Sequence, residues 1–80
     1  MPVVLRYKGY RFYFFSNEGN PLEPLHIHVR KGGAVAKFWL VPEIKLADSY
    51  GMSGHELTEL AQVVRENRET IERTWNEFFG

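Results

Sequence analysis

Two histidines separated by one residue are the side chains of this sequence whose type and spacing could support chemistry. His26 and His28 lie in the stretch EPLHIHVRKGGAVAKFWL, residues 23–40, which is rich in residues typical of β-strands. Alternate side chains of a strand point to the same side, so both imidazoles would project from one face. Imidazole acts near neutral pH as a general acid or base and also as a metal ligand. The pair could therefore belong to a metal site, a catalytic site or a binding surface, or simply face solvent.

A metal site at this pair would need one or two further ligands. His55 is the third histidine of the chain, and nothing in the order of the sequence brings it close to the other two. The sequence contains no cysteine, which excludes a thiolate zinc site and a disulfide framework. We therefore treat His26, His28 and His55 as possible ligands of a divalent metal such as Zn²⁺, and the sequence indicates no other cofactor.

An enzymatic use of the histidines has less support. The sequence shows no nucleophile motif, no glycine-rich phosphate loop and no paired catalytic carboxylates. A small ribonuclease could use His26 or His28 to move the proton, with Lys37 or Arg30 stabilising the charge that develops on the phosphoryl oxygens. We expect the protein not to be an enzyme, and a small histidine- or metal-dependent nuclease is the alternative.

The elements that would position these side chains follow from the hydrophobic periodicity. The first half of the sequence predicts strands joined by short turns such as Lys8-Gly9 and Gly32-Gly33. The expected strands are Val3–Tyr7, Tyr10–Phe15, His26–Lys31, Ala34–Leu40 and a short edge strand at Ile44–Ala47. Because short turns connect antiparallel neighbours, this arrangement indicates an antiparallel sheet.

The C-terminal part of the sequence predicts a helix. Ser53 and Glu56 fit a capping box, in which each side chain accepts from a backbone N–H of the other residue. Apolar residues follow at helical spacing, namely Leu57, Leu60, Val64, Ile71, Trp75 and Phe78. One helix over Gly54 to Phe79 would be about 39 Å long, about twice the length of a six-residue strand. Either the helix breaks near Asn67, or its second half overhangs the sheet and packs on another chain; the lack of an internal glycine or proline favours a single or kinked helix.

Together these elements indicate one α+β domain over residues 1–80, mainly β over 1–48 and helical over 53–79. We expect a four- or five-stranded antiparallel sheet covered on one face by a long or kinked C-terminal helix. With 44% hydrophobic residues the chain can form a core, although 80 residues lie near the lower size limit for one. No segment approaches the roughly 20 apolar residues that span a bilayer, and no signal segment is evident, so we expect a cytoplasmic protein without membrane contact.

The turn at Gly32-Gly33 sets the register of the expected hairpin, because a two-residue turn pairs Lys31 with Ala34. The apolar side chains then fall on one face, which is the core side: Ile27, Val29, Ala36 and Phe38. The opposite, open face carries the candidate binding residues: Arg11, Tyr13, His26, His28, Arg30, Lys37 and Trp39. Within it, His28 lies opposite Lys37.

Charge is distributed unevenly although the net charge is zero. Residues 1–40 contain six Lys or Arg against two acidic residues, whereas residues 41–80 contain four against eight. A basic face with tyrosine and tryptophan suits single-stranded RNA or DNA, because cations neutralise phosphates and aromatic rings stack on bases. The neutral balance of the whole chain instead favours a protein partner, for which Trp, Tyr and Arg are common hot spots. We expect partner-protein binding or a homodimer first, and nucleic-acid binding second.

Several of these residues also resemble a known family. The resemblance rests on Glu23-Pro24-x-His26-x-His28-Val29, Ala36-Lys37-Phe38-Trp39-Leu40, Glu56-Leu57 and Trp75-x-Glu77-Phe78-Phe79. These motifs are similar to those of a family of small bacterial proteins, domain of unknown function 4160, over nearly the whole chain. The Pro-x-His-x-His strand start is the most specific of them; Leu25 and Ile27 stand where many members have a second proline or an aromatic residue.

Members of that family are often encoded beside another short protein, in an arrangement that resembles toxin–antitoxin pairs. The resemblance therefore implies a small partner protein encoded nearby and a role directed at RNA or DNA. It identifies no reaction and no catalytic residues. Combined with the open face, it predicts a toxin–antitoxin-like interaction module.

Overall fold

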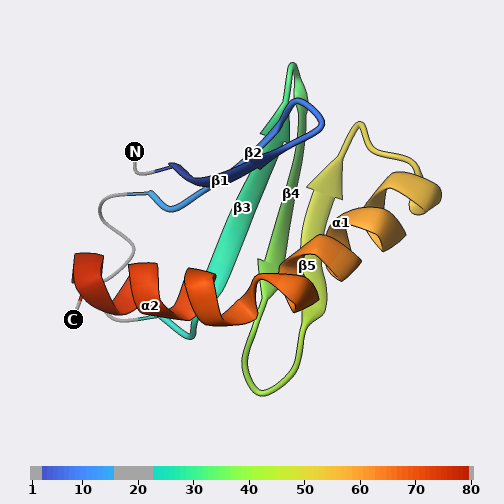
Figure 1. Ribbon diagram of the computed structural model, residues 1–80. Coiled ribbons are helices and arrows are strands. Elements are labelled where there is room, and N and C mark those ends of the chain that lie inside the picture. Colours follow the sequence, from blue (N-terminus) through green and yellow to red (C-terminus); the bar gives the residue numbers. More distant parts are fainter. Residues whose placement is uncertain (1–2, 16–22, 80) are drawn as a thin grey trace.

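The computed structural model describes residues 3–15 and 23–79. One antiparallel sheet contains five strands, arranged in their order along the chain, β1-β2-β3-β4-β5 (Figure 1). The strands are β1 (Val3–Tyr7), β2 (Tyr10–Tyr13), β3 (His26–Lys31), β4 (Ala34–Trp39) and β5 (Lys45–Tyr50), followed by the helices α1 (Gly54–Glu66) and α2 (Arg68–Phe79). The α+β class and the antiparallel sheet predicted from the sequence are confirmed.

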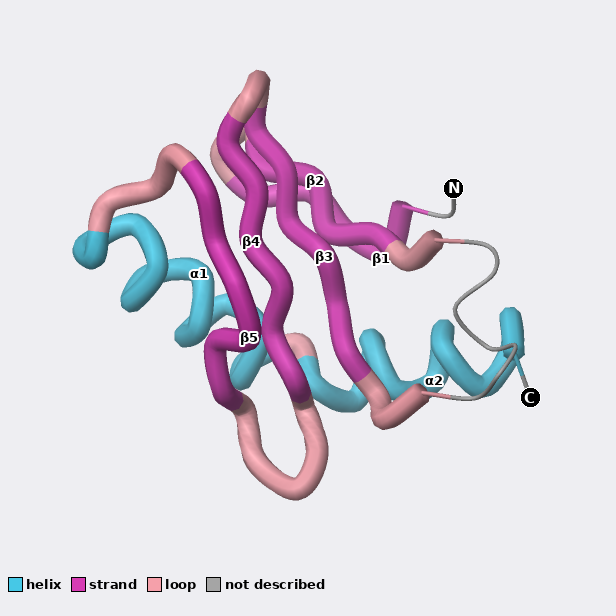
Figure 2. Tube along the Cα trace, turned by 180° about the vertical axis from the view of Figure 1, so that it is seen from behind, coloured by secondary structure: helices cyan, strands magenta, loops and turns pink. Residues whose placement is uncertain are grey.

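Both helices lie on the same side of the sheet. They run in front of the strands in Figure 1, and in the view from behind, Figure 2, the strands lie in front of them. In both views α2 crosses the end of the sheet at which β3 begins. No helix or strand of the described chain covers the opposite side, so this antiparallel sheet has one packed face and one open face.

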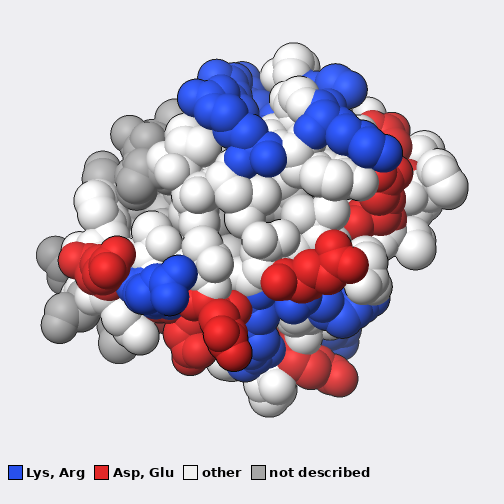
Figure 3. All heavy atoms as spheres, viewed as in Figure 1, with Lys and Arg blue, Asp and Glu red and all other residues white. Residues whose placement is uncertain are grey.

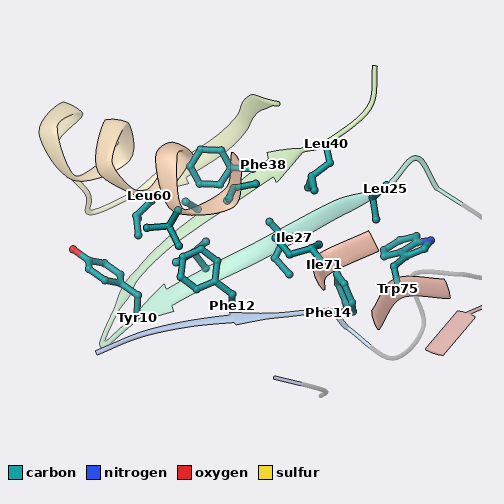
Figure 4. Close-up of a cluster of buried hydrophobic side chains, with 14 residues drawn as sticks. Tyr10, Phe12, Phe14, Leu25, Ile27, Phe38, Leu40, Leu60, Ile71 and Trp75 are labelled. Carbon is teal, nitrogen blue, oxygen red and sulfur yellow. The ribbon is translucent and has the colours of Figure 1, made fainter. Parts of the chain in front are cut away.

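The core lies between the sheet and the helices. Phe12, Ile27 and Phe38 have at most 1% of their surface exposed and come from three neighbouring strands. The helices contribute the buried side chains of Leu60, Val63, Val64, Ile71 and Trp75. Figure 4 shows the strand and helix side chains converging in one layer. Burying one such large apolar side chain stabilises a fold by about 1.5–3 kcal/mol, so this layer holds the sheet to the helices.

The β3–β4 hairpin has the register predicted from its glycine turn. The pairs are Lys31–Ala34, Arg30–Val35, Val29–Ala36, His28–Lys37, Ile27–Phe38 and His26–Trp39. Gly32 adopts a φ of +58°, a left-handed conformation that glycine reaches without steric cost. On the other side of β3, Arg11 pairs with Arg30 and Tyr13 with His28. The predicted distribution of side chains over the two faces therefore holds along this part of the sheet.

The helical region is divided at Asn67, which is the first of the two arrangements considered from the sequence. The capping box at its start is present, with Ser53 Oγ accepting from the Glu56 N–H and Glu56 Oε1 accepting from the Ser53 N–H. Asn67 leaves the helical conformation and its side-chain amide donates to the Val63 carbonyl at 2.8 Å. Arg68 then donates to the Leu40 carbonyl at 2.8 Å. The first bond caps the end of α1, and the second ties the start of α2 to the residue that follows β4.

Three strands have other bounds than predicted, and for β4 the difference is one residue, because it ends at Trp39 rather than Leu40. β2 ends at Tyr13 rather than Phe15, and β5 covers Lys45–Tyr50 rather than Ile44–Ala47. The β4–β5 register skips Ala47, which makes it the extra residue of a β-bulge. A bulge interrupts the alternation from which strands are predicted. Neither of the two described helices is long and apolar enough to cross a bilayer.

Candidate functional site

The open face is the surface of the sheet that faces away from the helices. Cross-strand pairing assigns residues to it, because paired residues lie on the same side of a sheet. One row runs across four strands from Tyr13 through His28 and Lys37 to Asp48. Val3 of β1 extends this row, and the neighbouring rows add Arg11, Arg30, Val35 and Tyr50 on one side and Trp39 and Lys45 on the other. The structure therefore gathers the predicted binding residues of β2, β3 and β4 on one face.

A groove of about 260 Å³ lies at the centre of the open face. Its walls include Tyr13, Phe15, His28, Val35, Lys37, Asp48 and Tyr50. The Tyr13 and His28 rings stack with centroids 5.5 Å apart, and Phe15 meets His28 edge-on at 4.6 Å. These contacts hold the aromatic side chains in fixed positions, so the groove presents a preformed, mainly apolar surface.

Exposed apolar side chains are concentrated around this groove. Three of the five large hydrophobic residues exposed in the described chain lie on the open face, namely Val3, Phe15 and Tyr50. Tyr50 is the most exposed, with 74% of its surface accessible. Clustered exposed apolar groups are typical of interaction surfaces. Sequence reasoning missed Phe15 and Tyr50; the alternation after Tyr13 could have placed Phe15 here, whereas Tyr50 depends on the unpredicted extension of β5.

Lys37 is the cation nearest the centre of the groove. Its ammonium lies 4.4 Å from the centroid of the Trp39 ring and 3.8 Å from Glu23 Oε1. The side chain is 26% exposed. Asp48 lies in the adjacent position of β5. The positive charge of the groove is therefore partly balanced by carboxylates, while Arg11 and Arg30 remain exposed at its far end.

His26 does not share the exposure predicted for it. Its side chain is fully buried, with ring centroids of Trp39, Trp75 and His28 at 5.5, 5.2 and 5.1 Å. The register does pair it with Trp39, but α2 crosses the start of β3 and brings Trp75 against the imidazole. Nδ1 lies 2.9 Å from the Pro24 carbonyl oxygen, an acceptor, so Nδ1 carries the proton. A ring packed in this way is a structural part of the strand end and cannot reach a bound substrate.

The three candidate metal ligands are not brought together as one cluster. His26 and His28 rings meet edge-to-face, whereas His55 lies exposed in the first turn of α1. Within residues 3–15 and 23–79, no three His, Asp or Glu side chains are grouped as a metal site requires. Among these described residues, His26, His28 and His55 therefore do not form one cluster of metal ligands.

A second polar cluster, the α1 anchor, ties the start of α1 to the β1–β2 hairpin. It consists of Tyr7, Lys8, Tyr10, Glu56 and Glu59. The Tyr7 hydroxyl donates to Glu59 and the Tyr10 hydroxyl to Glu56, each at 2.5 Å, and Lys8 Nζ lies 3.1 Å from Glu59. The bonds that the two hydroxyls donate to these carboxylates raise the pKa of both phenols. The pKa of Glu59 is lowered, first by the Tyr7 bond and then by the Lys8 bond.

The helix side differs from the open face in its charges. Figure 3, viewed as in Figure 1, shows basic groups along the upper part and interleaved acidic and basic groups below. On α2, the exposed residues Glu69, Glu72 and Glu77 line a surface hollow together with Arg73. Mixed charges of this kind are typical of a solvated helix surface. The open face therefore combines cations with a preformed aromatic groove in a way that the visible helix side does not.

Comparison with known proteins agrees with the resemblance seen in the sequence. The family model described as "Domain of unknown function (DUF4160)" matches residues 9–76, from the β1–β2 turn to near the end of α2. No curated protein and no solved structure matches the chain significantly. The motifs around His26 and His28, β4, α1 and most of α2 fall within the matched range. The chain therefore belongs to the DUF4160 family, a domain of unknown function.

Proposed function

We propose that this domain is a cytoplasmic interaction module of the toxin–antitoxin-like type, which binds a small partner protein encoded nearby. The observation that carries the proposal is the uncovered sheet face with its preformed aromatic groove, where Phe15 and Tyr50 remain exposed. Interfaces of this kind are anchored by a few aromatic side chains and surrounded by charged groups. Here Lys37, Arg30 and Asp48 form the charged surroundings.

A protein fits this face better than a nucleic-acid strand as the main partner. The Tyr13 side chain is only 6% exposed and stacks on His28, which leaves little of its ring for a base. Lys37 is already near Glu23, and Asp48 places a carboxylate beside the groove. A carboxylate there repels phosphates, whereas a protein can offer charges of both signs and an apolar anchor.

The test is binding of the purified partner encoded nearby, measured by calorimetry with Tyr50→Ala. We expect the dissociation constant to rise at least tenfold, because truncating an aromatic hot spot costs about 2 kcal/mol or more. Phe78→Ala is the matched control, since Phe78 is also an exposed aromatic residue but belongs to α2. Equal affinities of the wild type and Tyr50→Ala would refute binding at the groove.

Single-stranded RNA or DNA is the second candidate, favoured by Arg11 and Arg30, which pair across β2 and β3 in the row next to that of Tyr13 and His28. If a nucleic acid binds there, Arg11→Ala and Arg30→Ala should weaken its binding, and affinity should fall steeply with added salt. Fluorescence anisotropy with a labelled oligonucleotide measures both effects. A nuclease on this face would have to use His28, since His26 is buried; RNA cleavage that is lost in His28→Ala would identify one.

A further inference from the structure

β5 ends the sheet and leaves one side of its backbone without a strand neighbour. It pairs with β4 alone among the described strands, and Figure 2 shows it at the margin of the sheet in front of α1. Lys45, Leu46, Ala47 and Asp48 are all exposed. An exposed edge presents unpaired N–H and C=O groups, which are a template for a further strand.

The charges of this edge are self-complementary. When a second copy of β5 is laid antiparallel with the two-fold axis between Leu46 and Ala47, Lys45 of each copy falls opposite Asp48 of the other. The pairing creates two identical ion pairs and sets Leu46 against Ala47 twice. Opposite charges directly across a strand pair are stabilising, and like charges are destabilising. The sequence Lys-Leu-Ala-Asp therefore fits an antiparallel copy of itself.

The bulge at Ala47 is what puts the two charges on one side of the sheet. Lys45 lies opposite Trp39 and Asp48 opposite Lys37, and these two residues of β4 share the open face. In a regular strand, residues three apart would point to opposite faces. Because a two-fold axis perpendicular to the sheet keeps its faces, the ammonium and carboxylate of the two copies meet on the same side.

The charges also select this register over its neighbours. Shifting the axis onto Lys45 places two ammonium groups opposite each other, and shifting it onto Asp48 does the same with two carboxylates. Both groups are available for pairing: neither forms an ion pair within the described chain, and Asp48 Oδ1 accepts from the adjacent Ser49 N–H at 2.9 Å. Charges on an edge strand thus prevent indiscriminate pairing while permitting one alignment.

An apolar hollow lies beside β5, where a second copy of the strand would cover it. It lies between β5 and α1, has a volume of about 280 Å³, and is lined by Ile44, Leu46, Leu57 and Ala61. Leu46 is 39% exposed although it lies opposite the core residue Phe38. Strand addition at this edge would shield the hollow and remove Leu46 from water.

From these features we infer that two copies of the chain pair through β5 into a continuous ten-stranded sheet. The dimer carries both open faces on the same side, so that two binding grooves point in one direction. The dimer contact shares Asp48 with the wall of the groove proposed for the partner protein, whereas Lys45, Leu46 and Ala47 lie outside that groove, and the dimer forms without that partner.

The pairing is tested by charge reversal in sedimentation experiments on the full chain without any partner. We expect the wild type to dimerise in a concentration-dependent way, and Lys45→Glu or Asp48→Lys to raise the dimer dissociation constant at least about tenfold, since each reversal opposes two pairs. The exchange variant Lys45→Glu/Asp48→Lys should restore dimerisation. Arg73→Glu on α2 is the matched control for the change in net charge.

A wild-type chain that stays monomeric at high concentration would overturn the inference. So would a dimer that tolerates the single reversals, or one that the double exchange does not restore. Far-ultraviolet circular dichroism of each variant shows that the fold is intact. The partner-binding assay uses Tyr50→Ala, whereas the dimerisation assay uses Lys45→Glu and contains no partner. A failure of one proposal can therefore be told apart from a failure of the other.

Discussion

The two faces of the sheet come from the same strands, yet their side chains differ in exposure to water. Toward the helices, Phe12, Ile27 and Phe38 lose nearly all contact with water. Away from them, Tyr50 and Lys37 keep accessible surface around a groove. Strand alternation assigns a side chain to a face, but exposure depends on what lies over that face. The comparison therefore separates the side chains that stabilise this domain from those that remain accessible on the open face.

His26 is an exception to the exposure of the open face. By its register it belongs to the open face, but Trp75 of α2 packs against its ring and leaves it fully buried. His28, two residues on, lines the groove and stacks on Tyr13. Two histidines of one strand thus have different surroundings, one buried within the fold and one on the open face.

The largest expected effect comes from removing a ring on the packed face. We expect Phe12→Ala to lower the free energy of unfolding by about 3–5 kcal/mol, because a cavity opens in a fully buried site. Arg11→Ala, the adjacent exposed residue, should change it by no more than about 0.5 kcal/mol. Urea unfolding at neutral pH measures both. Similar losses for the two variants would mean that the two faces are not distinct.

A smaller difference should separate the two histidines. We expect His26→Ala to cost about 2–3 kcal/mol of unfolding free energy, through lost packing against Trp39 and Trp75 and an unpartnered Pro24 carbonyl. His28→Ala should cost about 1 kcal/mol, chiefly the stacking on Tyr13. The same urea experiment compares them. If His28→Ala proved the more damaging, the roles assigned to the two rings would be reversed.

Much of the sheet could be predicted because its turns and strand faces depend on residues that are close together in the sequence. The Gly32-Gly33 turn and the alternation of β3 and β4 were sufficient to give the register of their hairpin and the face of each side chain. β5 was placed less well, because the bulge at Ala47 breaks the period of two on which such predictions depend.

The remaining features depend on contacts between distant parts of the chain. The division of the helix at Asn67 involves no glycine or proline; the bond from Arg68 to the Leu40 carbonyl links residues far apart in sequence. Burial of His26 likewise requires Trp75 to cross the end of β3. The groove needs Tyr50 beside Phe15, and nothing in the sequence near either residue indicates the other.

The smallest expected effect concerns the α1 anchor and its dependence on pH. Tyr10→Phe removes the hydroxyl that donates to Glu56 and leaves the ring in the core. We expect a lower melting temperature for this variant at neutral pH. Tyr50→Phe is the control, because the Tyr50 hydroxyl makes no hydrogen bond within the part of the chain that the structure describes.

The gap in melting temperature between the wild type and Tyr10→Phe should depend on pH in a defined direction. The pKa of Glu56 is held below its ordinary value of 4.5, first by the Ser53 backbone N–H and then by Tyr10. The stability that the ionised Glu56 carboxylate contributes to the fold is therefore complete above about 4.5 and is lost as the pH falls through the lowered pKa. The pKa of Tyr10 is raised above 10.0, chiefly by the bond to Glu56. The stability that the protonated Tyr10 hydroxyl contributes is therefore complete below 10.0 and is lost as the pH rises through the raised pKa. The gap should therefore be widest between these two limits and narrow on both sides, whereas Tyr50→Phe should show no such profile. A gap that stays constant into strong acid would show that the stability gained from the Tyr10 hydroxyl does not depend on the ionised Glu56 carboxylate.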